Sequence, residues 1–142
     1  MPKSPTQIAL SQKHADPARV AVRAAVRLDE DSQRTAVSAA RAALEKKAEE
    51  VVVLDLRGVS GYTDFLVIGS GTSDRQLEAI AESVEKELHA QGHRLIGSEG
   101  QRGGRWVLLD FGDVVVHVFH IDERAHYDLE GLWVDAPRLD VE

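Results

Sequence analysis

Three histidines and two aspartates near the C-terminal end of the sequence could, by residue type, bind a metal ion. They are His117, His120 and His126, with Asp110 and Asp113. Metal ligands must converge on one point. His117 and His120 lie in a predicted strand, where side chains alternate, so residues at i and i+3 point to opposite faces. We therefore predict no metal site and no cofactor.

The segment Gly69-Ser70-Gly71-Thr72-Ser73, between a predicted strand and a predicted helix, is a second candidate for chemistry. Backbone amides at a helix N-terminus can bind phosphate. The segment has no lysine, however, and fits neither G-x-x-x-x-G-K-[ST] nor G-x-G-x-x-G. Ser73 and Gln76 have the spacing of a capping box, and Gly71 would supply an unusual turn. We interpret the segment as a helix cap.

Catalytic groups are not evident elsewhere in the chain. It contains no cysteine, which excludes disulfides and thiolate metal sites, and no serine has an evident partner base. We predict no catalytic residue and no enzyme. The alternative is a nucleotidyltransferase-like enzyme that uses the Gly71–Ser73 loop with Asp110 or Asp113. Such an enzyme needs paired metal-binding carboxylates near the loop, and no Asp-x-Asp occurs there.

The composition indicates one acidic domain. The chain has 142 residues, 43% of them hydrophobic, and 17 basic against 24 acidic residues give a net charge of −7. Nucleic-acid-binding proteins usually have the opposite balance, so we expect little direct contact with nucleic acid. If the protein works on a nucleic-acid machine, we expect it to contact the basic proteins of that machine more than the RNA. The charge could equally serve solubility alone. No run of about 18 apolar residues and no signal-peptide pattern occurs, which predicts a cytoplasmic protein without membrane association.

Apolar periodicity defines the elements that must position any site. A helical stripe begins near residue 31 and comprises Ala36, Val37, Ala40, Ala43, Leu44 and Ala48. Strands are predicted at Val51–Leu56, Phe65–Gly69, His93–Ser98, Arg105–Asp110 and Val114–His120, and helices from Ser73 to about Ala90 and at Asp122–Glu130. The short gap after the first strand predicts that it pairs antiparallel with the second. The second strand, the long helix and the third strand are predicted to form one right-handed parallel unit.

The fold class is therefore α/β: a mixed five-stranded sheet with helices packed against it, in the order α-β-β-α-β-β-β-α. We predict one domain over residues 31–137. Residues 1–30 form a predicted extension, mobile or partly helical at Pro17–Leu28, and residues 138–142 form an irregular C-terminal tail.

The last two predicted strands form a hairpin with two different faces. If Phe111-Gly112 is the turn, Trp106 lies opposite His117 and Leu108 opposite Val115. One face is wholly aliphatic: Val107, Leu109, Val114, Val116 and Val118. The other, which we call the mixed face, carries Trp106, Leu108, Val115, His117 and Phe119. The mixed face is either a docking surface anchored by tryptophan or a surface covered by the C-terminal segment with Trp133.

From about Ser32 to Pro137 the chain resembles the ribosomal silencing factor (Iojap-related) family. The resemblance rests on Lys46-Lys47-Ala48-Glu49, Thr63-Asp64-Phe65, Gly71-Thr72-Ser73-Asp74-Arg75-Gln76, Glu99-Gly100, Trp106-Val107-Leu108-Leu109-Asp110 and Gly112-Asp113-Val114-Val115-Val116-His117-Val118-Phe119. Arg124, Tyr127, Leu129, Glu130, Leu132-Trp133 and Asp135-Ala136-Pro137 complete the set.

The resemblance implies a domain that is nucleotidyltransferase-like in outline but lacks the metal-binding acidic pair. It also implies binding to large-subunit ribosomal protein fourteen, which would block joining of the small subunit and repress translation. The position of Trp106 belongs to that contact surface in the family, and homodimers occur among relatives. The predicted partner-binding residues are Trp106, Leu108, His117, Phe119, Glu99 and Asp110. The remaining alternative is a generic protein-interaction module, and we expect Trp106→Ala to weaken binding more than folding.

Overall fold

The computed structural model describes residues 29–59, 61–100, 105–139 and 141. The predicted helix at Pro17–Leu28 and most of the predicted N-terminal extension lie outside the described residues. The elements are α3 (Asp29–Glu45), β1 (Glu49–Asp55), β2 (Phe65–Gly71), α4 (Asp74–Ala90), β3 (Gly97–Glu99), β4 (Trp106–Asp110), β5 (Val114–His120), α5 (Ile121–Tyr127), α6 (Leu129–Leu132) and β6 (Arg138–Leu139). No helix among the described residues is long and apolar enough to cross a membrane.

The sheet is mixed, as predicted, but it has six strands rather than five. The strand order is β3-β4-β5-β2-β1-β6. The additional strand, β6, pairs antiparallel with β1 through Leu139 and Arg138. The prediction of an irregular tail at 138–142 was therefore wrong for these two residues. A strand of two residues is too short to produce an alternating pattern that the sequence could reveal.

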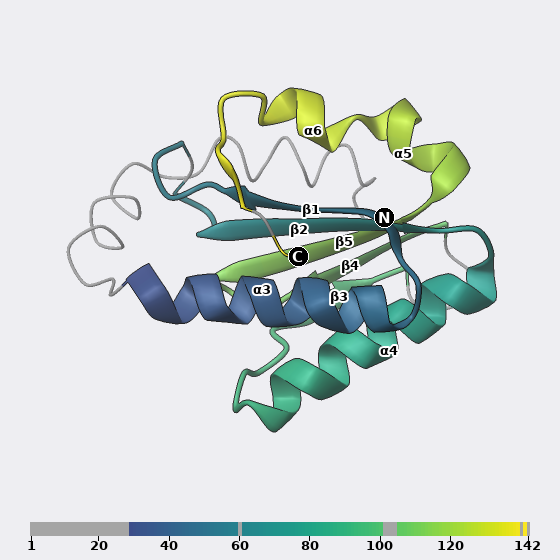
Figure 1. Cartoon of the computed structure of the whole chain (residues 1–142), viewed down its shortest axis with the longest axis horizontal. Coiled ribbons are helices and arrows are strands. Elements are labelled where there is room, and N and C mark those ends of the chain that lie inside the picture. The colour runs from purple at the N-terminus through teal and green to yellow at the C-terminus, as the bar shows by residue number, and fades with distance from the viewer. Residues whose placement is uncertain (1–28, 60, 101–104, 140, 142) are drawn as a thin grey trace.

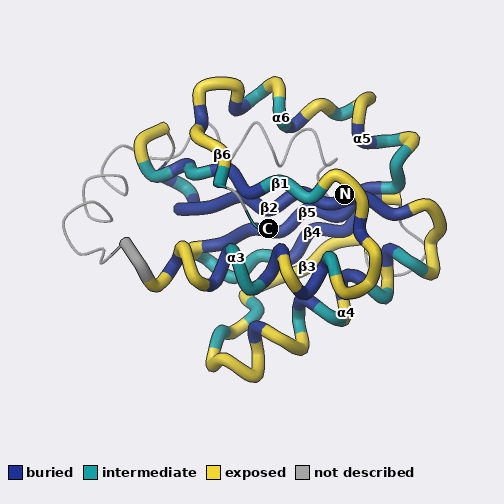
Figure 2. Tube along the Cα trace, viewed as in Figure 1, coloured by how far each residue is buried: buried dark blue, intermediate teal, exposed yellow. Residues whose placement is uncertain are grey.

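Helices α3 and α4 pack on one face of the sheet, and α5 and α6 lie over the other (Figure 1). The sheet-facing sides of α3 and α4 are buried and their outer sides exposed (Figure 2). The predicted alanine stripe of α3 joins the aliphatic face of the hairpin in one core cluster, which includes Ala36, Ala40, Val107, Leu109 and Val116. The prediction that helices cover this aliphatic face is thus confirmed.

The strand pairing corrects one predicted unit. β1 and β2 are antiparallel neighbours, as predicted. The parallel neighbour of β2 is β5, not the strand that follows α4. That strand, β3, is parallel to β2 but lies at the sheet edge, with β4 and β5 between them. The sequence shows that a crossover occurs but not how many strands it passes.

The hairpin turn also differs from the prediction. The turn residues are Gly112 and Asp113, because the amide of Phe111 donates to the carbonyl of Val114 at 2.9 Å. Gly112 has a φ of 89°, and its amide donates to Oδ1 of Asp110 at 2.8 Å. An aspartate that binds the backbone two residues later favours a turn at that point.

The register of the hairpin is accordingly shifted. Trp106 pairs with Phe119, and Leu108 with His117, instead of the predicted Trp106–His117 and Leu108–Val115 pairs. The two faces keep their predicted residues, because a shift of two residues preserves an alternation whose period is two.

Candidate functional site

The mixed face is covered by the C-terminal segment. Trp106 is 6% exposed and Leu108 8%, while His117 is fully buried. The core cluster that contains Trp106 and Leu108 also contains Leu129, Trp133 and Ala136, with Tyr127 and Leu132 packed against it. We call residues 121–137, which contain α5 and α6, the C-terminal layer. Of the two alternatives for the mixed face, the structure bears out the second, in which the C-terminal segment with Trp133 covers it.

Trp106 and His117 form a buried polar pair within this second core. The indole Nε1 of Trp106 donates to Nδ1 of His117 at 2.8 Å. Nδ1 must therefore lack a proton, and the neutral ring carries its proton on Nε2. Nε2 is buried and has no hydrogen-bond partner among the described residues. Burial lowers the pKa of His117 from 6.5 to about 3, so the ring is neutral at pH 7.

Two aromatic rings pack against the indole, Phe119 from β5 of the sheet and Tyr127 from the C-terminal layer. The ring centroid of Trp106 lies 4.2 Å from that of Phe119 and 4.4 Å from that of Tyr127. Tyr127 comes from α5, so the indole links the sheet to the covering helix. These contacts hold Trp106 in one position.

Arg124 of α5 anchors the C-terminal layer to the sheet. Its side chain is 8% exposed. It donates to Oγ of Ser70 at 2.9 Å and to the carbonyl of Glu49 at 3.4 Å. Its Nε also lies 3.0 Å from Oε1 of Glu130. A buried guanidinium needs such partners to offset its loss of hydration. The sequence analysis noted Arg124 only as a family motif residue and gave it no role.

The predicted acidic helix is two helices. α5 ends at Tyr127, and the next residue, Asp128, caps it in the left-handed conformation with a φ of 43°. The Asp128 carboxylate then accepts from the amide of Gly131 and caps α6. The break directs Leu129 and Trp133 onto the sheet, where both are buried.

The remaining predicted contact residues lie at the rim of the mixed face. Glu99 of β3 is exposed and pairs with Leu108 of β4. Asp110 is half-buried, and its Oδ2 accepts from the Tyr62 hydroxyl at 2.9 Å. Sequence reasoning missed Tyr62, which lies in a loop 48 residues before Asp110. We call Glu99 and Asp110, together with the small exposed parts of Leu108 and Trp106, the rim.

The Gly69–Ser73 segment caps α4, but not as a complete capping box. Oγ of Ser73 accepts from the amide of Gln76 at 3.1 Å, as predicted. The Gln76 side chain does not return to Ser73. It accepts from the Thr72 amide at 2.7 Å and donates to the carbonyls of Lys46 and Lys47 at 3.1 and 3.0 Å. Gln76 thereby connects the start of α4 to the end of α3.

Gly71 does not supply an unusual turn, because among the glycines that the structure describes a positive φ occurs at Gly92, Gly100 and Gly112. Gly71 ends β2. A Cβ at this position would lie 3.2 Å from Oε1 of Gln76, so close packing explains the glycine.

The histidines and aspartates of the first candidate site have separate positions. His117 is bound by Trp106, and Nδ1 of His120 accepts from the amide of Asp122 at 3.3 Å. His126 lies edge-on to Tyr127. Within the described ranges, no group of three or more histidine, cysteine, aspartate or glutamate side chains could hold a metal ion.

Comparison with known proteins gives consistent matches. The family described as "Ribosomal silencing factor during starvation" matches residues 29–142. A ribosomal silencing factor from Halalkalibacterium halodurans is 51% identical over 98 residues, which cover 69% of this chain and 84% of that protein. A protein of Chromobacterium violaceum with a crystal structure superposes with a TM-score of 0.71 at 36% identity, over 73% of this chain and 87% of that one. The mouse protein "Mitochondrial assembly of ribosomal large subunit protein 1" is 34% identical over 92 residues, 63% of this chain and 40% of that protein.

Proposed function

The chain belongs to the family of ribosomal silencing factors, and on that basis we propose that it binds the large ribosomal subunit and blocks joining of the small one. The family match over residues 29–142 is the observation that carries the proposal. The partner we propose is large-subunit ribosomal protein fourteen. The protein would act in the cytoplasm by occupying space that the small subunit needs, without covalent chemistry, and it would thereby repress translation.

We propose the rim as the contact surface. Glu99 is exposed on the edge strand β3, next to Leu108, and it offers a carboxylate beside an apolar side chain. Asp110 adds a second carboxylate at the end of β4. Such a surface suits a basic protein, because complementary charge steers association and determines orientation. The chain's net charge of −7 agrees with a basic partner and with little direct contact to nucleic acid.

His117 and Phe119 have an indirect part in this proposal. Both are fully buried, so they would not touch a partner while the C-terminal layer stays in place. They would position the Trp106 ring, to which His117 bonds and against which Phe119 packs. Trp106, which is 6% exposed, would present only a small part of its surface to the partner.

The mouse relative is named for assembly of a large ribosomal subunit, which supports the choice of the large subunit over the small one. A homodimer is a further proposal that the family resemblance suggests. Analytical ultracentrifugation of the free chain would test this proposal, because a homodimer has twice the mass of the monomer.

The test is sedimentation with purified ribosomal subunits. The chain should pellet with large subunits and not with small ones, and its addition should reduce joined ribosomes in sucrose gradients. Glu99→Lys, which reverses one charge at the rim, should weaken large-subunit binding by about tenfold. The matched control is Glu78→Lys on α4, on the other side of the sheet, which should bind normally. Pelleting with small subunits alone, or with neither, contradicts the proposal.

A nucleotidyltransferase-like enzyme is the competing function, and it makes a different prediction. A ligand that binds only the folded state raises the melting temperature. If the chain uses ATP and magnesium, a thermal melt with both should show a saturable rise. We expect no rise, since the side chain of Ser73 is occupied in capping α4 and Gln76 in joining α4 to α3.

A further inference from the structure

The turn between β4 and β5 is tied to the segment that leads into β2. The amides of Asp64 and Phe65 both donate to the carbonyl of Asp113, each at 3.0 Å. Asp64 is 1% exposed, so this segment is enclosed by the fold. Tyr62 lies two residues before Asp64, and its ring packs against the core cluster of the mixed face. Both the ring of Tyr62 and the backbone that follows it are therefore supported.

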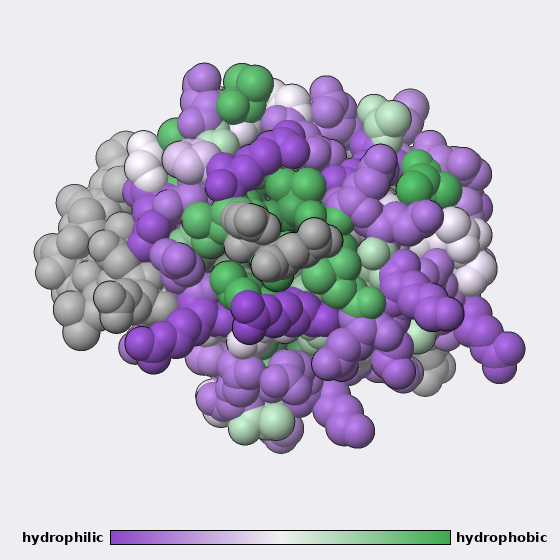
Figure 3. Space-filling view, viewed as in Figure 1, coloured by the Kyte–Doolittle hydropathy of each residue, from purple (hydrophilic) through white to green (hydrophobic). Residues whose placement is uncertain are grey.

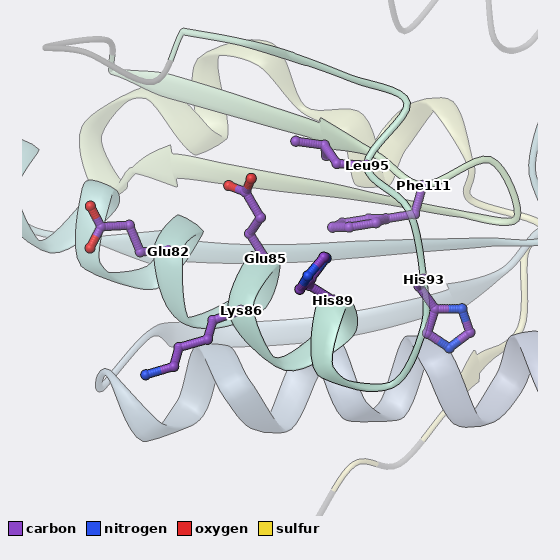
Figure 4. A pocket seen from close by; sticks show the side chains of 7 residues that line it. All are labelled: Glu82, Glu85, Lys86, His89, His93, Leu95 and Phe111. Carbon is purple, nitrogen blue, oxygen red and sulfur yellow. The ribbon is translucent and has the colours of Figure 1, made fainter.

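The carboxylate of Asp110 is held by two hydrogen bonds at the end of β4. Asp110 lies on the side of the mixed face, because side chains alternate along a strand. The next residue, Phe111, packs on the main core cluster and lines a hollow beside α4 (Figure 4). The amide of Gly112 donates to Oδ1 of Asp110 at 2.8 Å, and the Tyr62 hydroxyl donates to Oδ2 at 2.9 Å. The two donors meet different oxygens, so together they fix the rotation of the carboxylate.

The held carboxylate can still bind a partner. A carboxylate has about four lone-pair positions that accept hydrogen bonds, and Gly112 and Tyr62 occupy two of them in the part of the chain that the structure describes. The terminal torsion of an aspartate is broad when nothing restrains it, and the Gly112 amide alone would hold one oxygen only. Ordering a side chain on binding costs affinity. An Asp110 carboxylate that is already oriented therefore binds a partner more tightly than a mobile one.

We propose that Tyr62 is a positioning residue of the rim: its hydroxyl holds the Asp110 carboxylate in the orientation that meets the partner protein. The inference rests on the proposed binding of the large subunit, and it adds a residue that the rim does not include. Tyr62 acts through Asp110 and needs no contact of its own with the partner.

Tyr62→Phe tests the proposal, because it keeps the ring and removes only the hydroxyl. Binding to purified large subunits should weaken by about three- to tenfold, since the partner must now order the carboxylate. The variant keeps every charge, so its association rate and the salt dependence of that rate should match the wild type, while the complex dissociates faster. Asp110→Asn removes a charge and should instead slow association. Biolayer interferometry with the immobilised chain measures both rates.

A second background separates positioning from a general structural role. If Tyr62 acts through Asp110, Tyr62→Phe should have no further effect on binding when Asp110 is already alanine. An equal loss of affinity in the wild-type and Asp110→Ala backgrounds would show that the hydroxyl acts by another route, and would overturn the proposal.

Ser83→Ala is the matched control for Tyr62→Phe. The Ser83 hydroxyl donates to the carbonyl of Ala42 at 2.9 Å, so this variant also loses one half-buried hydrogen bond. Ser83 lies on α4, across the sheet from the mixed face, where the outer sides of α3 and α4 are mostly hydrophilic (Figure 3). It should bind large subunits normally, and thermal melts measure the stability of both variants. If Ser83→Ala weakens binding as much as Tyr62→Phe, lost stability explains both results and the proposal fails.

The same measurements distinguish this inference from the proposed function. A wild-type chain that does not bind large subunits contradicts the proposed function, and the role of Tyr62 falls with it. A wild-type chain that binds, together with a Tyr62→Phe variant that binds as tightly, contradicts the role of Tyr62 alone.

Discussion

The indole N–H of Trp106 points into the protein, where it donates to Nδ1 of His117 at 2.8 Å beneath the C-terminal layer. A tryptophan that serves only as a docking anchor would present its N–H to the partner or to water. Here the bond fixes the tautomer of a buried histidine and joins β4 to β5 on the mixed face. The pair therefore has a structural role, whatever the small exposed part of Trp106 contributes to binding.

The first prediction concerns Trp106 itself. Trp106→Ala should lower the free energy of unfolding by about 3–5 kcal/mol, the usual cost of truncating a buried aromatic residue. This replaces the expectation from the sequence that binding would suffer more than folding. Trp106→Phe keeps a ring but removes the donor to His117, and should cost about 1–3 kcal/mol. Urea denaturation measures both.

A double-mutant cycle separates the hydrogen bond from packing. His117→Leu is combined with Trp106→Phe, and the coupling energy should be about 0.5–3 kcal/mol. Additive costs would mean that the Trp106–His117 bond contributes nothing to stability.

The second prediction is a pH dependence from His117. Burial lowers its pKa from 6.5 to about 3 in the folded protein, so between these values the unfolded chain binds a proton that the folded chain does not. Stability from this group is complete above pH 6.5 and is lost progressively as the pH falls toward 3. The slope is about 1.4 kcal/mol per pH unit, which gives a loss of roughly 2 kcal/mol at pH 5.

The control for this pH dependence is His117→Asn, whose side-chain oxygen can still accept from Trp106. Asparagine does not titrate, so unfolding free energies of the variant should fall less steeply between pH 7 and pH 5. Parallel slopes in the two proteins would show that His117 is not the titrating group.

The third prediction concerns the anchor of the C-terminal layer. Arg124→Met keeps an unbranched stem but removes the contacts to Ser70, Glu49 and Glu130. We expect a loss of about 2–3 kcal/mol, less than for a fully buried ion pair, because Glu130 is 27% exposed and can be hydrated. Amide hydrogen exchange should become faster in α5 and α6 and change little in α4.

Arg105→Met is the matched control for Arg124→Met. Arg105 forms an ion pair with Glu123, which lies in α5 like Arg124. The side chain of Arg105 is 49% exposed. Exposed pairs contribute about 0–1 kcal/mol, so exchange in α5 and α6 should stay near the wild-type rate. If both variants accelerate exchange equally, Arg124 is not a special anchor.

The fourth prediction separates the observed cap of α4 from a complete capping box. Ser73→Ala should cost about 1 kcal/mol, as the loss of an N-cap side chain usually does. Gln76→Ala should cost at least as much, because Gln76 binds backbone groups of Thr72, Lys46 and Lys47.

Gln76→Glu distinguishes the two arrangements. Glutamate is a standard residue of the capping box and would be tolerated there. In the observed arrangement it has no N–H to donate to the carbonyls of Lys46 and Lys47, so it should destabilise the chain about as much as alanine. A Gln76→Glu protein as stable as the wild type would indicate that the link between α3 and α4 does not matter.

The residue pattern alone was sufficient for features that depend on local periodicity. The apolar stripe of α3 and the buried face of α4 follow from a period near 3.6 residues, and the two faces of the β4–β5 hairpin follow from a period of two. The face assignment survived an error in the turn, because the register moved by two residues from the predicted Trp106–His117 pair to Trp106–Phe119. The motifs between Lys46 and Pro137 likewise sufficed to identify the family.

Only the tertiary structure decided what covers each apolar face. An apolar pattern shows that Trp106, His117 and Phe119 avoid water, but it does not distinguish a partner protein from the chain's own C-terminal layer. That layer depends on contacts between residues far apart in sequence, such as Arg124 with Ser70. The same holds for the pairing of β6 with β1 and for the position of β3 at the sheet edge. Long-range pairing leaves no period in the sequence, so these features appear only when the chain is folded.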